Sequence, residues 1–305
     1  MALLQLLRLP NLIIVALTQY LLYYRLLRPA MTDAGIAPVF DHVHFALFVA
    51  VTLAITGGGN IINDLIDYEV DLINRPQRIV LHRRISVQTA YWLVGALLLP
   101  GFLAAFFLAA YVERLPLLGL YPAALAGLFS YNAFLKRKAL IGNLVIAAYC
   151  AGAAAVLWVA EAPPLQQLAR QAPAVYEKTR SIFTWFLVFA FLATLFRELV
   201  KDLEDVVGDQ SARFRTAPIR WGTIKTRRLA FGLGALLLAF VAGYAWHYRQ
   251  QFGRPALLYL ALSIGLPLLI ALGSLHRART PAAFHRVSTL TKLVIAAGVL
   301  LLLFV

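Results

Sequence analysis

Residues 57–78 read GGGNIINDLIDYEVDLINRPQR, where an apolar segment of membrane length ends in a row of carboxylates. Asp64, Asp67 and Asp71 are spaced i, i+3 and i+7, so on a helix their side chains lie along one stripe. Three like charges on one face destabilise a helix unless a cation lies between them. The stretch therefore predicts a membrane helix that ends in a cation site. Oxygen ligands of this kind favour Mg²⁺, which often completes its shell with waters and substrate phosphates.

The same spacing returns further along the chain, in the sequence FRELVKDLEDVVGD. Asp202, Asp205 and Asp209 again stand at i, i+3 and i+7, and most of the protein's 14 acidic residues lie in these two stretches. One such row alone could be the solvated end of a helix. Two rows, each at the end of an apolar segment, predict facing carboxylates that hold Mg²⁺ between them. Glu69 and Glu204 lie off the two stripes, and we expect them to be solvated.

The composition is that of a polytopic membrane protein. Of the 305 residues 61% are hydrophobic and 14% charged, which is too apolar for a soluble domain of this size. Apolar segments long enough to cross a membrane occur at residues 9–27, 43–63, 88–110, 115–135, 140–160, 181–200, 229–248, 256–275 and 287–305. We therefore predict an all-α fold of about nine transmembrane helices in one bundle, forming a single domain over residues 1–305. The acidic rows end the second and sixth segments, so the bundle is expected to contain internal pseudo-repeats.

The net charge of +14 is explained by membrane orientation rather than by nucleic-acid binding. Basic residues cluster in the loops between spans, and most of the 28 Lys and Arg residues lie on the side of the acidic rows. By the positive-inside rule, the N-terminus and the active site face the cytoplasm and the C-terminus lies outside the cell (inner) membrane. The opposite side carries the longest predicted loop, residues 161–180, whose prolines favour an irregular crossing.

The acidic rows and their neighbours also carry a family resemblance. NDxxDxxxD at residues 63–71, NRPxR at residues 74–78 and the second DxxDxxxD resemble the UbiA superfamily of intramembrane prenyltransferases, from about Leu9 to the C-terminus. RELVKDLEDVVGD followed by TAPIRWG is most similar to the digeranylgeranylglyceryl phosphate synthase branch. The resemblance implies an enzyme of lipid biosynthesis that transfers a polyprenyl group from a prenyl diphosphate to a membrane-associated acceptor.

Such a transfer needs the charge of its leaving group to be neutralised. Ionisation of a prenyl diphosphate leaves an allylic cation and pyrophosphate, and Mg²⁺ held between two carboxylate rows stabilises the developing charge. The expected catalytic and metal-binding residues are the six aspartates of the two rows: Asp64, Asp67, Asp71, Asp202, Asp205 and Asp209.

The substrate-binding candidates lie beside these rows. Asn60 and Asn63 extend the first stripe inward. Basic side chains donate charge-assisted hydrogen bonds to a diphosphate, and the candidates of this kind are Arg75, Arg78, Lys136, Arg197 and Lys201. The segment SYNAFLKRK followed by GN resembles the end of the family's fourth span, which adds Tyr131 and Asn143 and supports Lys136. The cluster at residues 136–138 is equally explained as an orientation signal.

Two departures from the family pattern bear on the acceptor. His82 precedes Arg83 where relatives usually have Gly-Arg, and Arg213 stands where they have Gly. Both positions fall in loops expected to cap the site. The excess of positive charge on this side favours a lipid-like acceptor that carries a phosphate, resembling geranylgeranylglyceryl phosphate, and we expect His82 and Arg213 to help recognise it.

Two other functions remain open from the sequence. An aromatic quinone precursor is the main alternative acceptor within the same enzyme class. A cation transporter is the alternative of another class, because intramembrane acids often mark ion paths. The acidic residues gather at one membrane face rather than at the centre of a span, which favours the enzyme.

Aromatic residues in the sixth segment allow two interpretations. Phe183, Trp185, Phe186 and Phe189 could line a tunnel for an isoprenoid chain and shield its cation. Their position in a membrane helix favours contact with lipid instead.

Overall fold

The protein is built of helices in the computed structural model, which describes residues 1–304 and has no β-strand among them. The elements are α1 (Ala2–Leu6), α2 (Leu9–Leu21), η1 (Leu22–Leu27), α3 (Arg28–Thr32), α4 (His42–Asn74), η2 (Pro76–Arg78), α5 (Val87–Tyr111), η3 (Leu115–Gly119), α6 (Leu120–Ala133), η4 (Leu135–Arg137), α7 (Ile141–Ala160), α8 (Ala162–Gln171), α9 (Pro173–Glu204), α10 (Val206–Ser211), α11 (Ala217–Trp221), α12 (Thr223–His247), α13 (Arg254–Tyr259), η5 (Leu260–Gly265), α14 (Leu266–Arg277), α15 (Pro281–Leu300) and η6 (Leu301–Phe304). The prediction of an all-α fold is confirmed.

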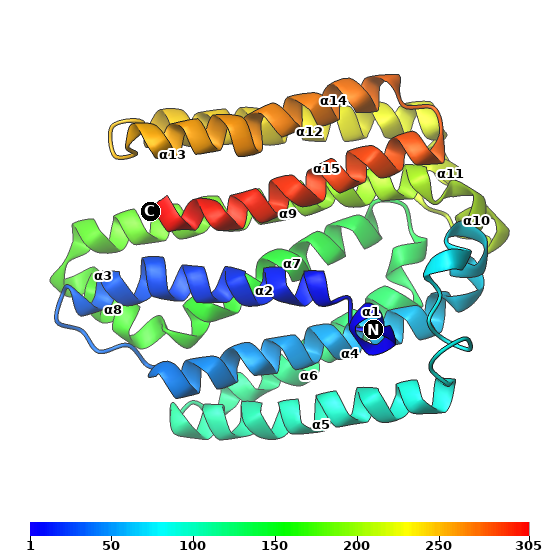
Figure 1. Ribbon diagram of the computed structural model, residues 1–305. Coiled ribbons are helices and arrows are strands. Elements are labelled where there is room, and N and C mark those ends of the chain that lie inside the picture. Colours follow the sequence, from blue (N-terminus) through cyan, green and yellow to red (C-terminus); the bar gives the residue numbers. More distant parts are fainter. Residues whose placement is uncertain (305) are drawn as a thin grey trace.

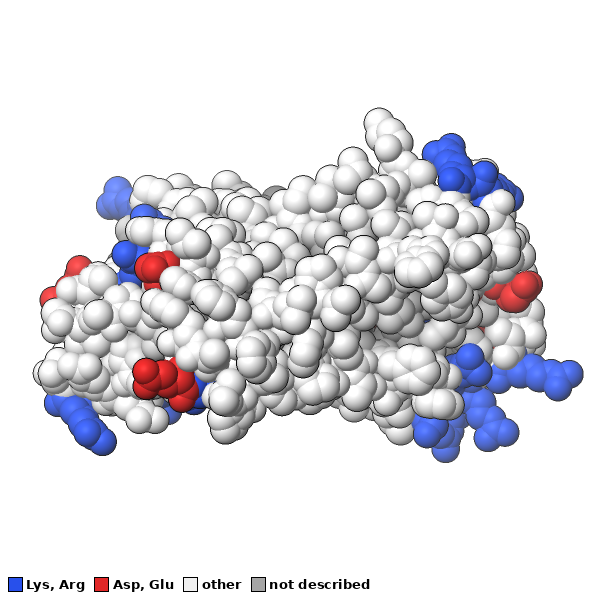
Figure 2. Space-filling model, turned by 90° about the horizontal axis from the view of Figure 1, so that it is seen from below, with Lys and Arg blue, Asp and Glu red and all other residues white. Residues whose placement is uncertain are grey.

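The long helices run side by side along one direction and form a bundle (Figure 1). Short helices α10 and α11 cover one end of the bundle, and α3 and α8 lie at the other. Figure 2 shows the charged side chains gathered at the two ends of the face it draws, with an uncharged band between them. This distribution is that of a protein whose middle lies in the hydrocarbon core of a membrane.

Eight helices in the described part of the chain are long and apolar enough to cross a membrane, where about nine were expected. The difference is the first expected segment. It forms α2, η1 and α3, which follow one another without a break from Leu9 to Thr32, but Asn11, Gln19 and Arg25 lower its hydropathy. The polytopic architecture predicted from the sequence is confirmed, with eight apolar spans and this more polar helix.

The prediction of an irregular loop at residues 161–180 is wrong. Residues 162–171 form α8, and α9 already begins at Pro173. The prolines lie in the first turns of these two helices. A proline is tolerated there because its missing N–H would have no partner inside the helix and its φ suits the helical start.

Helix α9 occupies the middle of the bundle and packs against α7, α12 and α15, while α4 packs against α5. A run of glycines permits the close approach of α4 and α5, since a Cβ atom on Gly58 would lie 2.7 Å from the Leu98 side chain. The main apolar core extends from Leu22 to Leu302 and so includes both halves of the chain. This arrangement places the ends of α4 and α9, which carry the acidic rows, at one end of the molecule.

Candidate active site

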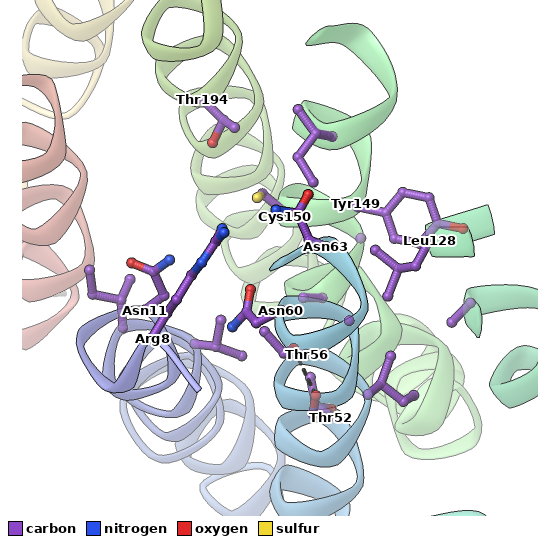
Figure 3. A pocket seen from close by; sticks show the side chains of 18 of the residues that line it. Arg8, Asn11, Thr52, Thr56, Asn60, Asn63, Leu128, Tyr149, Cys150 and Thr194 are labelled. Atoms are coloured by element: carbon purple, nitrogen blue, oxygen red, sulfur yellow. Dashed lines mark hydrogen bonds between the residues drawn. The ribbon is translucent and has the colours of Figure 1, made fainter. Parts of the chain in front are cut away.

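A cavity of about 1040 Å³ lies within the bundle and is lined by residues of α2, α4, α6, α7, α9 and α15. Figure 3 shows Arg8, Asn60 and Thr194 bordering it from the start of α2, from α4 and from α9. One end is polar and is lined by Asp64, Asp67, Asp71, Arg75, Lys136, Lys201 and Asp205. The other end is apolar and is lined by Phe40, Phe48, Leu108, Val112, Leu117 and Ala160.

The first acidic row lies on one stripe of a continuous helix, as its spacing predicts. Helix α4 extends to Asn74, and the proline at position 76 disfavours any further helical turn. All five polar residues expected on this stripe line the cavity: Asn60, Asn63, Asp64, Asp67 and Asp71. The regular 3.6-residue period of α4 is therefore sufficient to aim the whole row into the cavity.

The second acidic row departs from the predicted helical stripe. Helix α9 ends at Glu204, Asp205 lies at the junction with φ −94° and ψ 8°, and α10 begins at Val206. Asp205 lines the cavity. Asp202 lies on α9 and accepts a hydrogen bond of 3.0 Å from Asn143 Nδ2, whereas Asp209 is buried on α10. The second row is therefore not carried on one continuous helix as predicted, because the chain bends at Asp205.

Asn74 explains where this bend lies. Its Nδ2 donates to the Asp205 carbonyl oxygen at 3.2 Å, and its Oδ1 accepts from the Gly208 N–H at 2.9 Å. A Cβ atom at Gly208 would lie 2.4 Å from Asn74 Nδ2, so only glycine permits the contact. The end of α4 therefore holds the turn that carries the second row. Sequence reasoning did not assign a role to Asn74, although it begins the NRPxR motif.

Three aspartates of the rows pair with basic side chains. Arg8 Nη2 lies 2.5 Å from Asp64 Oδ1, and Lys136 Nζ pairs with Asp67 Oδ1. Arg75 Nη2 lies 2.8 Å from both Asp205 carboxylate oxygens. The predicted positions of Lys136 and Arg75 beside the rows are thus found. Arg8 was missed as a site residue because its partner lies far along the sequence, in another helix.

The remaining candidates are also near the rows. Tyr131 and Arg197 line the cavity. Glu198 accepts hydrogen bonds from Arg197 at 2.6 Å and Lys201 at 3.3 Å. The side chain of Arg78 lies outside the described part of the structure.

The two glutamates beside the rows differ from each other. Glu69 is exposed, as expected. The expectation of a solvated Glu204 is wrong, since its Oε1 lies 3.3 Å from Arg75 Nη2 and 2.9 Å from His285 Nδ1. The bend after α9 turns Glu204 toward Arg75.

The electrostatics at the bend reflect burial among acids. Burial raises the pKa of Asp205, and the neighbouring Arg75 opposes that rise. Burial, reinforced by the Asp205 carboxylate, raises the pKa of Asp209 to about 7. A cation between Asp205 and Asp209 would stabilise the ionised form of both carboxylates.

Among residues 1–304, no three His, Cys, Asp or Glu side chains stand close enough together to form a complete metal cage. Asp64, Asp67 and Asp205 form ion pairs with basic side chains instead of facing one another. The ligand types nevertheless fit Mg²⁺, because carboxylate and amide oxygens line the polar end of the cavity. This ion is usually held by one or two carboxylates, and substrate phosphates and waters complete its shell.

The two departures from the family pattern share an unusual backbone. His82 has φ +62° and Arg213 has φ +57°, both in the left-handed region that favours glycine. Both residues are exposed, and neither is among the described residues that line the cavity. A glycine would adopt this backbone without strain at either position. The His82 ring lies 4.4 Å from the ring of Tyr68, which lines the cavity, and recognition of the acceptor by His82 and Arg213 stays a prediction.

The aromatic residues of α9 also divide into two groups. Phe186 and Phe189 are buried and line the cavity. Phe183 is buried 4.9 Å from Trp158, and Trp185 packs 4.4 Å from Phe240. The lipid-facing interpretation is wrong for the three phenylalanines, because α9 lies at the centre of the bundle.

Comparisons with known proteins agree with this geometry. The model of the UbiA prenyltransferase family matches residues 29–303. The digeranylgeranylglyceryl phosphate synthase of Haloquadratum walsbyi is 32% identical over 248 residues, which are 80% of this chain and 76% of that protein.

Solved structures show the same fold. A structure of digeranylgeranylglyceryl phosphate synthase in membranes is 22% identical, with a TM-score of 0.63 over 100% of this chain and 98% of the other. A UbiA homolog from Archaeoglobus fulgidus bound to GPP and Mg²⁺ is 18% identical, with a TM-score of 0.53 over 99% of each chain. Because the family match covers most of the chain and includes both acidic rows, the chain belongs to the UbiA prenyltransferase family and is a membrane-embedded prenyltransferase.

Proposed function

We propose that this enzyme transfers a polyprenyl group from a prenyl diphosphate to a lipid-like acceptor resembling geranylgeranylglyceryl phosphate, with Mg²⁺ as cofactor. The observation that carries the proposal is the polarity of the cavity. Carboxylates and bases line one end, and mostly apolar side chains, with a few hydroxyl and amide groups among them, line the rest. A prenyl diphosphate has the same division into a charged head and an apolar tail.

The six aspartates are proposed as the residues that hold Mg²⁺. Asp64, Asp67 and Asp71 lie on α4, Asp202 lies on α9, Asp205 lies at the junction after it and Asp209 lies on α10. Oxygen ligands and the acidic surroundings of the bend support this assignment. When bound, Mg²⁺ neutralises the charge that develops on the diphosphate. The homolog from Archaeoglobus fulgidus bound to GPP and Mg²⁺ shares the fold and supports the same cofactor here.

The basic residues of the polar end would bind and orient the diphosphate. Arg75, Lys136 and Lys201 line this end and already lie beside carboxylates. Their N–H groups donate to phosphate oxygens as the bond between the allylic carbon and the diphosphate oxygen breaks. The cavity lining beside these bases also includes Asn60, Asn63, Tyr131 and Arg197, which we propose to contact the substrate, and Asn143 donates a hydrogen bond to Asp202.

The acceptor would react through a hydroxyl group. Its oxygen forms a new bond to the allylic carbon, and its proton passes to the released diphosphate. The apolar lining excludes water, which would otherwise capture the allylic cation. Phe186 and Phe189 present π-systems to this space and add stabilisation of positive charge.

A phosphate on the acceptor is supported by charge and by similarity. Arg8 and Lys292 also line the cavity, which adds positive charge beyond the groups assigned to the diphosphate. The relative from Haloquadratum walsbyi is named a digeranylgeranylglyceryl phosphate synthase.

The proposed membrane orientation is supported by the distribution of the basic residues. The loops at the acidic end contain most of the protein's Lys and Arg, which supports a cytoplasmic N-terminus and active site, with the C-terminus outside the cell (inner) membrane. In Figure 1 the marked N-terminus lies toward the end of the bundle that carries α10 and α11, and the marked C-terminus lies toward the opposite end.

The test is turnover by the purified protein in detergent or vesicles. Prenyl diphosphates are incubated with a glyceryl-phosphate ether acceptor or an aromatic quinone precursor, with Mg²⁺ or with EDTA. Pyrophosphate release and product masses are measured. We expect a prenylated glyceryl phosphate that forms only with Mg²⁺. Preference for the aromatic acceptor overturns the acceptor assignment, and ion flux without pyrophosphate release would identify a transporter.

A further inference from the structure

The cavity extends far beyond the acidic rows. Its lining on α4 runs from Asp71 back to Phe48, a stretch about 35 Å long at the rise of an α-helix. This length is comparable to the hydrocarbon thickness of a membrane. The space for an apolar tail therefore reaches the opposite end of the bundle, where Phe40, Phe48, Val112, Leu117 and Ala160 border it.

Phe40 stands at this far end and does not belong to a helix. It lies in the segment between α3 and α4, and its side chain is only 3% exposed. Its ring lies 5.4 Å from that of Phe48, the last residue of the α4 lining. Both rings line the cavity at this end, and together they are called the aromatic wall below.

The backbone at Phe40 is fixed by side chains from two other elements. Glu161, between α7 and α8, accepts hydrogen bonds from the Val39 N–H at 2.8 Å and the Phe40 N–H at 3.3 Å. Tyr23, in η1, donates its hydroxyl to the Phe40 carbonyl oxygen. The peptide groups on both sides of Phe40 are thereby held in place.

The Glu161 carboxylate holds this backbone from a fully buried position, which costs free energy. It is 0% exposed, and burial raises its pKa while the two backbone N–H donors oppose the rise. Burying a carboxylate costs free energy unless it is well hydrogen-bonded. Connecting segments of this kind are ordinarily mobile. A strong anchor at this position, far from the acidic rows, points to a need for a rigid wall.

We propose that Phe40 determines the prenyl chain length, because its ring ends the channel for the tail, and that Glu161 is the positioning residue that keeps the ring there. The proposal rests on the proposed function. With the diphosphate at the acidic rows, the tail extends along α4 toward the wall. A tail longer than the channel collides with the Phe40 ring, and removal of the ring lengthens the channel.

The experiment compares four donors with the full-length enzyme, Mg²⁺ and one acceptor: geranyl, farnesyl, geranylgeranyl and geranylfarnesyl diphosphate. The value of kcat/KM is measured for each. In the Phe40→Ala protein, kcat/KM for the next longer donor is expected to rise relative to that for the preferred donor. The expected change is about tenfold or more, the discrimination that one apolar group provides. In the Phe40→Trp protein, kcat/KM for a shorter donor is expected to rise relative to that for the preferred donor.

Phe107→Ala is the matched control. Phe107 lies on α5, is 51% exposed and does not line the cavity in the described structure. The Phe107→Ala protein is expected to rank the donors as the wild type does. Monodispersity and thermal midpoint establish folding of each variant, and Phe40→Leu replaces Phe40→Ala if the latter does not fold.

Glu161→Gln tests the anchor separately. Its amide offers one accepting oxygen in place of two, so one of the two N–H groups loses its partner. We expect smaller differences in kcat/KM among the four donors, while the turnover of the preferred donor is retained. Equal loss of rate for every donor would overturn the positioning role of Glu161.

The outcomes separate this inference from the proposed function. If the wild type transfers none of the four donors, the proposed function fails. If the wild type is active and the active Phe40 variants keep its ranking, the chain-length inference alone is overturned.

Discussion

Arg75 Nη2 lies 2.8 Å from both carboxylate oxygens of Asp205, which joins the end of the first acidic row to the bend of the second. The same nitrogen lies 3.3 Å from Glu204 Oε1. One guanidinium thus orients both acids at the junction of α9 and α10. This contact and the two hydrogen bonds of Asn74 hold the second row beside the first, because no continuous helix carries the second row.

Replacement of Arg75 should therefore impair catalysis more than folding. We expect Arg75→Ala to lower turnover about 100-fold, the usual effect of losing one charged group that stabilises a transition state. Pyrophosphate release at saturating donor measures it. Arg83→Ala is the control, since Arg83 is an exposed base in the neighbouring turn. Equal losses in the two variants would contradict the role given to Arg75.

The second prediction concerns the contact between Gly208 and Asn74. An added Cβ atom at Gly208 would lie 2.4 Å from Asn74 Nδ2, so the clamp on the bend must open. We expect Gly208→Ala to reduce activity strongly and to destabilise the fold by about 1–3 kcal/mol, as overpacking does. The control is Gly273→Ala on α14, where a Cβ atom meets nothing within 4 Å. Thermal midpoints and turnover of both variants are compared, and an active, stable Gly208→Ala protein would refute the clamp.

The predictable parts of this molecule are those that depend on local periodicity. The apolar segments predict their helices, and the stripe of Asp64, Asp67 and Asp71 keeps its helical spacing because α4 continues through it. The identical spacing of the second row predicts the same structure but does not form it. There the bend depends on contacts with Asn74 and Arg75, which are distant in sequence.

The ion pairs between distant segments of the chain could not be predicted from the sequence either. Arg8 lies between α1 and α2, and its partner Asp64 lies near the end of α4. No periodic pattern connects the two. The same holds for Glu204, whose partners Arg75 and His285 come from two other parts of the chain. Contacts between remote segments decide these positions, and one sequence without its fold does not indicate them.

The aspartates of the rows should be separable from their acidic neighbours. Asp64→Ala and Asp202→Ala are expected to reduce turnover to background while leaving the protein monodisperse, because each removes an oxygen ligand rather than core volume. Glu69→Gln is expected to keep near wild-type activity, since Glu69 is exposed and lies off the stripe. The assay is Mg²⁺-dependent pyrophosphate release. Near wild-type activity in either aspartate variant would rule out the two-row site.

Membrane orientation can be measured by labelling single cysteines. Cys150 lines the cavity, so it is first replaced by Ala. A cysteine at position 82 should react with an impermeant maleimide only from the cytoplasmic side, and one at position 170, on α8, only from outside. Labelling of both from one side would overturn the proposed topology.

The left-handed backbone at His82 and Arg213 makes the last prediction. A residue with a Cβ atom pays about 1–2 kcal/mol in this conformation, whereas glycine does not. Glycine also gives the unfolded chain more freedom, which offsets about 0.4–1 kcal/mol of that gain. We therefore expect His82→Gly and Arg213→Gly to match or slightly exceed the wild-type thermal midpoint. The opposite change, Gly222→Ala at φ +85°, should lower it. Both residues lie outside the cavity lining, so the KM for a phosphate-bearing acceptor should stay unchanged. A clear rise in that KM for Arg213→Gly would instead restore Arg213 to acceptor recognition.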